Sequence, residues 1–309
     1  MIKLFHINNY DINTSRFSNL LHDDVVNEFE QNFADYVGAK YACSANSASS
    51  LLFLSLLKYN TTISIPSIMP IAVPNVIVNS GNSIEFYDDV DWVGSCYHLH
   101  RNIYDSAQQV SRNQYADLAK DDAIMIFSFY PTKPVGSCDG GMVVSNDQKI
   151  IDWFRVMTLN GTEFSENNWN RTQHTAGYKM HSTSIQAYIA NENLKKLDAK
   201  NERLEEISTI YNNHFGLNNR SKHLYRINVN NNKAFVAEMK KHNIICGIHY
   251  ECCHNHKSYK RTRRSPKIWM GNSLPLSDRE STTTVSLPFH EMLTDKDIEE
   301  VLKTVEKLK

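Results

Sequence analysis

Residues 62–87 predict a strand, a helix and a second strand, joined by short links. Residues 62–66 (TISIP) and 83–87 (SIEFY) carry the β-branched and aromatic side chains that strands favour. Residues 71–79 have the apolar content of a helix that ends before Gly81. Since parallel strands need a crossover connection of this kind, the alternation predicts an α/β fold with a parallel sheet.

The same alternation extends over most of the chain. The other expected helices lie at residues 23–36, 51–57, 148–159, 183–215, 233–241 and 295–308. The other expected strands lie at residues 41–43, 102–105, 123–127, 142–144, 222–229, 243–249 and 283–287. Residues 160–175 are polar and have no period, so we expect an exposed loop there.

The length of 309 residues exceeds what one minimal core requires. The long helix expected at residues 183–215 is a natural connection between two domains. We therefore predict a large domain at residues 1–200, with a mixed and mostly parallel sheet flanked by helices. A smaller C-terminal α/β domain would occupy residues 201–309.

The charge balance argues against nucleic-acid and membrane partners. The net charge is −1, from 33 lysines and arginines and 34 aspartates and glutamates, so no strong field attracts polyanions. No apolar run approaches the ~20 residues that span a bilayer, and residues 1–8 lack the apolar core of a signal peptide. The six cysteines are scattered without a CxxC pair. This pattern is typical of reduced thiols, and we expect a cytoplasmic protein.

One lysine stands in a loop between two expected strands. Residues 128–141 read SFYPTKPVGSCDGG, so Lys133 is flanked by prolines and followed by glycines. Such a loop holds a lysine by its backbone, as a lysine that forms a Schiff base with a carbonyl requires. A solvated loop lysine between two strands fits these residues equally well.

Two further positions suggest ligand contacts. Small polar residues at 44–50 precede an apolar helix, and backbone N–H groups at such a helix start can bind a phosphate. A plain helix cap by Ser47 or Ser49 is the alternative. Asp105 would end the strand at residues 102–105, at the edge where ligands bind in open α/β sheets. It could also act as a helix cap.

Thiols and imidazoles gather in residues 246–256, and basic residues gather in residues 256–267. Cysteine and histidine are ligands that zinc prefers, but this spacing fits no common zinc site. A basic run of this kind is usually solvated, and the balanced net charge gives no support for nucleic-acid binding. We expect neither a metal nor a nucleic acid.

Several motifs occur in one characteristic order. The most specific are DSAQ at 105–108 and SFYPTK at 128–133 with DGG at 139–141. The others lie at residues 29–42, 65–67 (IPS), 177–178 (GY), 185–187 (IQA), 247–250 (GIHY), 254 (H) and 286–288 (SLP). Together, from about Val25 to the C-terminus, they resemble the DegT/DnrJ/EryC1/StrS family of PLP-dependent sugar aminotransferases.

This resemblance implies a fold-type I PLP-dependent transferase, usually a homodimer with active sites at the subunit interface. It makes Lys133 the Schiff-base lysine and Asp105 the partner of the pyridine nitrogen, which a buried carboxylate keeps protonated. Gln108 would bond the ring hydroxyl, and Ala107 would lie against the ring. The residues implied for the cofactor phosphate are Ser128, Ala48 and Ser49.

The resemblance also implies a reaction. An amino acid donor, usually glutamate, would displace Lys133 from PLP, and a nucleotide-linked keto sugar would then take the amino group. Such reactions serve the synthesis of surface polysaccharides and other glycans, including lipopolysaccharide. Lys133 would be covalent partner and general acid/base, whereas dehydratases of the family carry histidine there. The substrate residues expected are His249, Tyr250, His254, Lys260 and Arg261, the last two from the basic run that could neutralise a diphosphate.

The chain departs from the family pattern in several places. The usual Ser-Gly-Thr motif reads Ser47-Ala48-Ser49, and Pro70 stands where an aromatic residue commonly stacks on the cofactor. Lys179 replaces an asparagine that usually reaches the neighbouring subunit's phosphate, and it could do so as a charge. The segment between Asp91 and Ile103 is far shorter than usual, so we expect a rebuilt sheet edge. These departures motivate an alternative, a non-catalytic relative that binds PLP or a sugar nucleotide as a sensor or scaffold.

Overall fold

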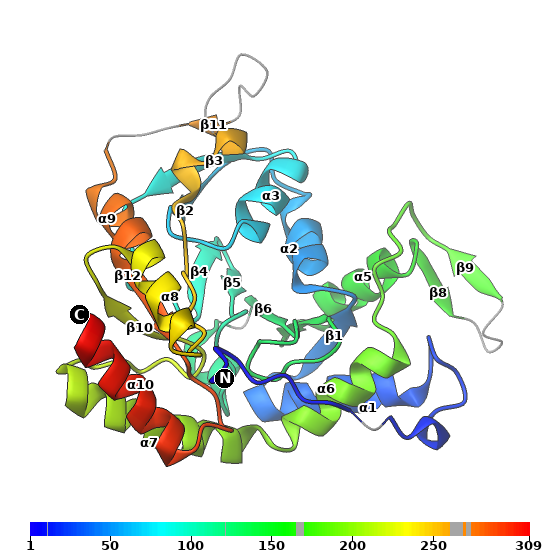
Figure 1. Cartoon of the computed structure of the whole chain (residues 1–309). Coiled ribbons are helices and arrows are strands. Elements are labelled where there is room, and N and C mark those ends of the chain that lie inside the picture. Colours follow the sequence, from blue (N-terminus) through cyan, green and yellow to red (C-terminus); the bar gives the residue numbers. More distant parts are fainter. Residues whose placement is uncertain (11, 121, 165–169, 260–267, 270–272) are drawn as a thin grey trace.

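The computed structural model describes the chain except for residues 11, 121, 165–169, 260–267 and 270–272 (Figure 1). The strands are β1 (Tyr41–Ala45), β2 (Thr62–Pro66), β3 (Ser83–Tyr87), β4 (Tyr97–His100), β5 (Ile103–Asp105), β6 (Ile124–Ser128), β7 (Gly141–Ser145), β8 (Thr162–Phe164), β9 (Arg171–Gln173), β10 (Tyr225–Asn228), β11 (Ile268–Trp269) and β12 (Thr284–Leu287). The helices are α1 (Asp24–Val37), α2 (Ala48–Leu56), α3 (Ala72–Asn79), α4 (Gln114–Leu118), α5 (Gln148–Thr158), α6 (Ser184–Leu194), α7 (Leu197–Phe215), α8 (Asn232–Lys241), α9 (Pro275–Thr283) and α10 (Asp295–Leu308). Short 3-10 turns lie at Thr14–Arg16, Cys253–Asn255 and Lys257–Tyr259.

A five-stranded sheet in the order β1-β7-β6-β5-β4 forms the centre of the molecule. Strand β7 runs antiparallel to both β1 and β6, β5 runs parallel to β6, and β4 runs antiparallel to β5. Helices cover both faces of this sheet. On β6, Ile124 and Ile126 pack into the core formed with α2, α3 and α5, whereas Met125 and Phe127 pack into the core formed with α1, α4 and α6. Burial on both faces explains why β6 reads as a continuous apolar run.

A second sheet contains β2, β3 and β11, which pair in parallel. It includes the strand–helix–strand unit predicted from residues 62–87. Strand β2 packs beside β4 without pairing with it, so the two sheets stay separate. The prediction of a mixed α/β architecture is confirmed. More strand pairs are antiparallel than the predicted, mostly parallel sheet would have. Strand β7 runs antiparallel to both of its neighbours, and β4 and β5 form an antiparallel hairpin.

The C-terminal part has a core of its own. It is built from α7, α8 and α10 around the antiparallel pair of β10 and β12. Helices α7 and α10 pack against each other there (Figure 1). Residue 200, the predicted domain boundary, falls within α7, and the division at that residue stays a prediction.

Three local predictions were wrong. The helix expected at residues 183–215 is interrupted at Lys195 and Lys196, because α6 packs into the core of the central sheet and α7 into the C-terminal core. The loop expected at 160–175 contains the hairpin of β8 and β9, which extends from the body in Figure 1. The strand expected at 243–249 forms only the isolated bridges Ile2–Ile244 and Gly247–Ser286.

The structure also bears on the expectations about disulfides and membrane-spanning segments. All six cysteines are free thiols, which agrees with the absence of a disulfide framework. Within the described part of the chain, every helix is too short or too polar to cross a bilayer.

Candidate active site

The loop that carries Lys133 leaves β6 and returns to β7. The N–H of Lys133 donates to the carbonyl oxygen of Tyr130 at 2.8 Å, and that of Ser137 donates to Phe129 at 2.7 Å. Gly136 has a φ of +56°, and a Cβ there would lie 2.9 Å from the carbonyl oxygen of Pro131. Only glycine therefore suits this return, and the loop fixes the backbone of Lys133.

A cavity of about 330 Å³ lies where β5 and β6 end, beside the start of α2. Seven of the predicted catalytic and cofactor residues line it together, although they come from three separate segments. These residues are Ala48, Ser49, Asp105, Ala107, Gln108, Ser128 and Lys133.

Lys133 and Asp105 influence each other inside this cavity. Burial lowers the pKa of Lys133 to about 8, and the charge of Asp105 opposes part of this change. Burial raises the pKa of Asp105, opposed by hydrogen bonds from Ala107 and Tyr97 and by the charge of Lys133. A lysine with a pKa near 8 has far more neutral amine at neutral pH than an ordinary lysine, and the neutral amine attacks carbonyls.

The side-chain amide of Gln108 is held in one orientation by the backbone of Gly94. Its Oε1 accepts a hydrogen bond of 3.0 Å from the N–H of Gly94. Because the oxygen is occupied, the Nε2 group is the end of the amide available to the cavity. Gln108 therefore offers a donor to whatever the cavity holds.

The start of α2 forms one end of the cavity. Ser47 caps the helix, since its Oγ accepts from the N–H of Ser50 at 3.2 Å. A Cβ at Gly141 would lie 2.4 Å from the backbone nitrogen of Ala48, so glycine allows β7 to approach this helix start closely. Ser128, the last residue of β6, adds a hydroxyl to the cavity. Open N–H groups, the helix dipole and a hydroxyl suit an anion such as a phosphate.

Trp92 and Tyr97 also line the cavity, and neither is among the site residues predicted from the sequence. The Nε1 of Trp92 donates to the carbonyl oxygen of Ile68 at 3.0 Å, which places the indole beside the segment that leads to Pro70. The rings of Trp92 and Tyr97 lie 4.6 Å apart. The shortened segment between Asp91 and Ile103 thus supplies an aromatic wall. The signal for this wall in the sequence is the pair of aromatic residues in the shortened segment.

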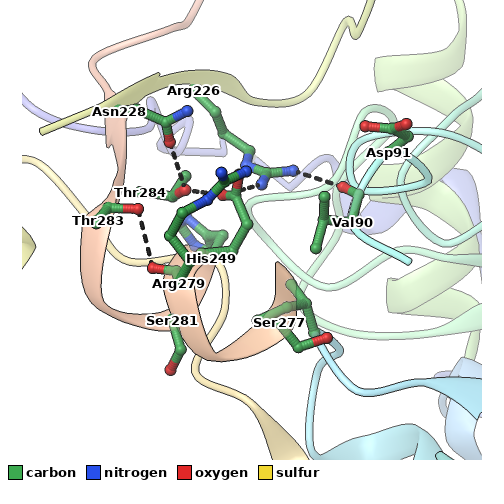
Figure 2. A network of polar contacts seen from close by, with 12 residues as sticks. Val90, Asp91, Arg226, Asn228, His249, Ser277, Arg279, Ser281, Thr283 and Thr284 are labelled. Carbon is green, nitrogen blue, oxygen red and sulfur yellow. Dashed lines mark hydrogen bonds and ion pairs between the residues drawn. The ribbon is translucent and has the colours of Figure 1, made fainter. Parts of the chain in front are cut away.

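A polar network fixes this segment from the C-terminal side (Figure 2). The Nη1 of Arg226 donates to the carbonyl oxygen of Val90 at 3.2 Å, and its Nη2 pairs with Glu280 at 3.0 Å. Asp88 accepts a hydrogen bond of 2.7 Å from the N–H of Ser277 in the first turn of α9. The connection that leads to Trp92 is therefore bound to β10 and to α9.

Among the described residues, Lys179, His249, Tyr250 and His254 lie outside the set that lines the cavity. Lys179 is exposed and lies near His22. The pKa of His22 is lowered first by burial, then by the charge of Arg171 and then by the charge of Lys179. His249 bonds Ser286 at 2.9 Å, and its pKa falls to about 4 through burial and the charge of Lys133. Burial and the charge of Asp105 raise the pKa of Tyr250.

His254 lies further along the chain, where its Nδ1 bonds the Oγ of Ser67 at 2.6 Å. Lys260 and Arg261 lie outside the described residues. The roles expected for these residues stay predictions.

The side chains of Cys252, His254 and Asp278 offer three atoms of metal-binding type within 4.8 Å of one another. The Nδ2 of Asn255 donates to the Oδ1 of Asp278 at 2.8 Å and to the Sγ of Cys252 at 3.2 Å. Two of the three atoms therefore already share a donor. These contacts account for the cluster as a polar network, and we assign it no metal.

The residues of the cavity fit PLP in chemical type. The cavity offers an amine for the aldehyde, a carboxylate for the ring nitrogen, an amide donor for the ring hydroxyl and a helix start for the phosphate. The carboxylate and the amide are both buried, with exposed fractions of 3% and 2%.

Comparison with known proteins agrees with this chemistry. The sequence model of the DegT/DnrJ/EryC1/StrS aminotransferase family matches residues 12–100 and 102–306. The spore coat polysaccharide biosynthesis protein SpsC of Bacillus subtilis is 26% identical over 91% of this chain and 88% of SpsC. A UDP-4-amino-4,6-dideoxy-N-acetyl-beta-L-altrosamine transaminase of Campylobacter jejuni is also 26% identical, over 91% of this chain and 88% of that enzyme.

Solved structures share the fold. The PLP form of Spr1654 from Streptococcus pneumoniae aligns with a TM-score of 0.83 at 17% identity and covers 99% of each chain. PseC of Helicobacter pylori, an aminotransferase involved in the biosynthesis of pseudoaminic acid, aligns with a TM-score of 0.80 at 17% identity and covers 100% of this chain and 99% of PseC.

Proposed function

Given that the chain belongs to the DegT/DnrJ/EryC1/StrS aminotransferase family, we propose that it transfers an amino group from glutamate to a nucleotide-linked keto sugar. The product would be an amino sugar for a surface polysaccharide or another glycan. The observation that carries the proposal is the single cavity that gathers Lys133, Asp105, Gln108 and the open start of α2.

Each residue has a defined task in this proposal. Lys133 would hold PLP through Nζ, and its amine would serve as the general acid/base that moves the proton of the substrate's α-carbon. Asp105 holds the proton on the ring nitrogen, and Gln108 donates from Nε2 to the ring hydroxyl. Bound PLP supplies the electron sink for this chemistry. The residues assigned to its phosphate are Ala48, Ser49 and Ser128.

Trp92 is our candidate for the aromatic contact that Pro70 does not provide. Its indole lines the cavity and is fixed by the bond to Ile68. Ala107 is small enough to leave room for a flat ring against it. A ring placed between Ala107 and Trp92 would gain apolar and stacking contacts.

The relatives support a sugar substrate. One carries a nucleotide-sugar transaminase name and another a polysaccharide biosynthesis name. We extend the proposal to a cytoplasmic homodimer in which Lys179 reaches the phosphate bound by its partner. His249, Tyr250 and His254 would contact the sugar. Lys260 and Arg261 would contact its diphosphate.

The test is a half-reaction followed by absorbance. Purified protein loaded with PLP should show the visible band of lysine-bound cofactor, lose it on adding glutamate and regain it with the right keto sugar. Thymidine-, uridine- and guanosine-linked keto sugars are the probes. Lys133→Ala should abolish the band, whereas Lys149→Ala, at an exposed lysine, should retain it.

Two outcomes would overturn the proposal. A protein that takes up no PLP is not an aminotransferase. A protein that binds PLP but transfers no amino group from any donor is the non-catalytic relative that Pro70 and the altered phosphate motif suggested.

A further inference from the structure

Tyr97 stands opposite Asp105 in the hairpin formed by β4 and β5. The two residues are direct partners in the register of this antiparallel pair. Side chains of directly opposed residues lie on the same face of a sheet, with Cβ atoms about 5 Å apart. The hairpin therefore brings the hydroxyl of Tyr97 to the carboxylate that ends β5.

The carboxylate of Asp105 has a separate donor for each oxygen. The hydroxyl of Tyr97 donates to Oδ2 at 2.8 Å, and the N–H of Ala107 donates to Oδ1 at 2.9 Å. The N–H of Ala107 belongs to the local turn after the strand. The hydroxyl, in contrast, comes from the shortened segment between Asp91 and Ile103.

Packing alone does not explain a tyrosine at position 97. The ring lies 4.6 Å from that of Trp92, at an interplanar angle of 57°, and a phenylalanine would make the same contact. The difference between the two residues is one hydroxyl, and that hydroxyl bonds Asp105.

We propose that Tyr97 is a positioning residue that keeps the Asp105 carboxylate ionised and oriented for the ring nitrogen of PLP. This inference rests on the proposed function. A buried carboxylate needs donors to stay charged, because burial favours its neutral form. Hydrogen bonds to a charged acceptor are stronger than those between neutral groups.

The surroundings of Asp105 leave few other groups for this task. Burial raises its pKa, and Ala107, Tyr97 and Lys133 lower it. In the described part of the chain, a thiol and a phenol also interact with Asp105, and burial and the charge of Asp105 raise the pKa of both. These groups are Cys96 and Tyr250.

The contacts around β4 keep the hydroxyl in place. The Oγ of Ser221 donates to the carbonyl oxygen of Gly94 at 2.9 Å, and the N–H of Cys96 donates to Gln109 at 3.0 Å. With the bonds of Trp92 and Gly94 described above, the turn that enters β4 is fixed on both sides. The hydroxyl of Tyr97 is therefore positioned before any cofactor binds.

The experiment measures the affinity of the cofactor-free protein for PLP as a function of pH. Ionised Asp105 strengthens binding, so affinity should fall at acidic pH as Asp105 becomes protonated. We call this fall in affinity the acid limb. In Tyr97→Phe the pH at which the acid limb occurs should rise by roughly one unit, the size expected from loss of a hydrogen bond to a charged group. Affinity at high pH should change little. Ionisation of the PLP phosphate affects every variant equally and cancels in the comparison.

Tyr104→Phe is the matched control. Tyr104 precedes Asp105 in β5, so its side chain points to the opposite face, where its ring contacts His98. This variant removes a hydroxyl from the same hairpin and should leave the acid limb in place. In an Asp105→Asn background, Tyr97→Phe should leave the pH dependence of the affinity unchanged, since no carboxylate remains at position 105.

The outcomes separate this inference from the proposed function. A wild-type protein that binds no PLP at any pH contradicts the proposed function. If the wild-type protein binds PLP and Tyr97→Phe weakens binding equally at every pH, Tyr97 has a packing role and the inference is wrong. An unshifted limb in Tyr97→Phe also overturns it.

Discussion

Arg226 on β10 donates a hydrogen bond of 3.2 Å to the carbonyl oxygen of Val90, and so holds the connection that leads to the cavity. The same guanidinium pairs with Glu280, whose side chain is only 9% exposed. Removal of Arg226 would leave this carboxylate without its cation in a poorly solvated position. One interaction thus couples the stability of the C-terminal part to the geometry of the cavity.

Arg226→Met should lower the free energy of unfolding by roughly 3 kcal/mol, because an uncompensated buried charge is costly. Urea unfolding of the cofactor-free protein measures this change. The double variant Arg226→Met, Glu280→Gln removes both charges and should recover more than half of the loss. A double variant as unstable as the single one would assign the loss to the Val90 hydrogen bond instead.

The rate of PLP attachment to the cofactor-free protein should rise with pH up to about 8, the pKa of Lys133. Below this value the protonated fraction grows, and the rate should fall about tenfold per pH unit. Asp105 raises the pKa of Lys133, so Asp105→Asn should move the curve to lower pH. Stopped-flow absorbance measures the rates. Asp139→Asn removes another carboxylate of the same cavity and should leave the curve unchanged; a curve for Asp105→Asn at higher pH would contradict the assignment.

Gln108→Glu should raise the Kd for PLP by roughly tenfold or more, because an acceptor would replace the donor that faces the ring hydroxyl. The bond to the N–H of Gly94 can persist, since a carboxylate oxygen also accepts. Gln109→Glu is the control, because Gln109 anchors the same segment through Cys96 without lining the cavity. Titration of the visible band gives both constants. Equal weakening in the two variants would mean that Gln108 acts only as an anchor.

The cofactor-free protein should lose stability between pH 6.5 and 4, in part through His249. Its pKa falls from 6.5 in an unfolded chain to about 4 in the fold, so the fold favours the neutral imidazole. The unfolded state therefore binds the proton first as the pH decreases, and stability is lost across this window. His249→Asn should reduce this loss by roughly 2 kcal/mol, whereas His256→Asn, at an exposed site, should not. Urea unfolding at pH 7 and pH 4.5 tests the difference.

Local sequence was sufficient to place Lys133 and Asp105 after the ends of strands, and the family resemblance added Gln108. Each stands at or just after the end of a short apolar strand, and parallel strands such as β5 and β6 present these ends at one edge. The helix predicted at residues 295–308 coincides with α10, since its apolar residues recur at helical spacing and Thr294 caps its start.

Tyr97 could not be predicted in the same way, because its role depends on which strand β4 pairs with. The length of a connection shows that an edge is rebuilt but does not show the register of the new pair. The break between α6 and α7 has neither proline nor glycine to mark it. It arises because the two helices pack on different cores, which only the tertiary structure shows.

The separation of β4 from β2 has a mechanical consequence. Within the described residues, no strand pairing crosses this line. The two sheets are joined there by packing between β2 and β4 and by the hydrogen bond from Trp92 to Ile68. A small displacement of one sheet along this line would break no hydrogen bond between paired strands. The cavity lies across it, with Pro70 and Val73 on one side and Asp105 and Lys133 on the other. The width of the cavity between these residues is therefore not fixed by a backbone ladder.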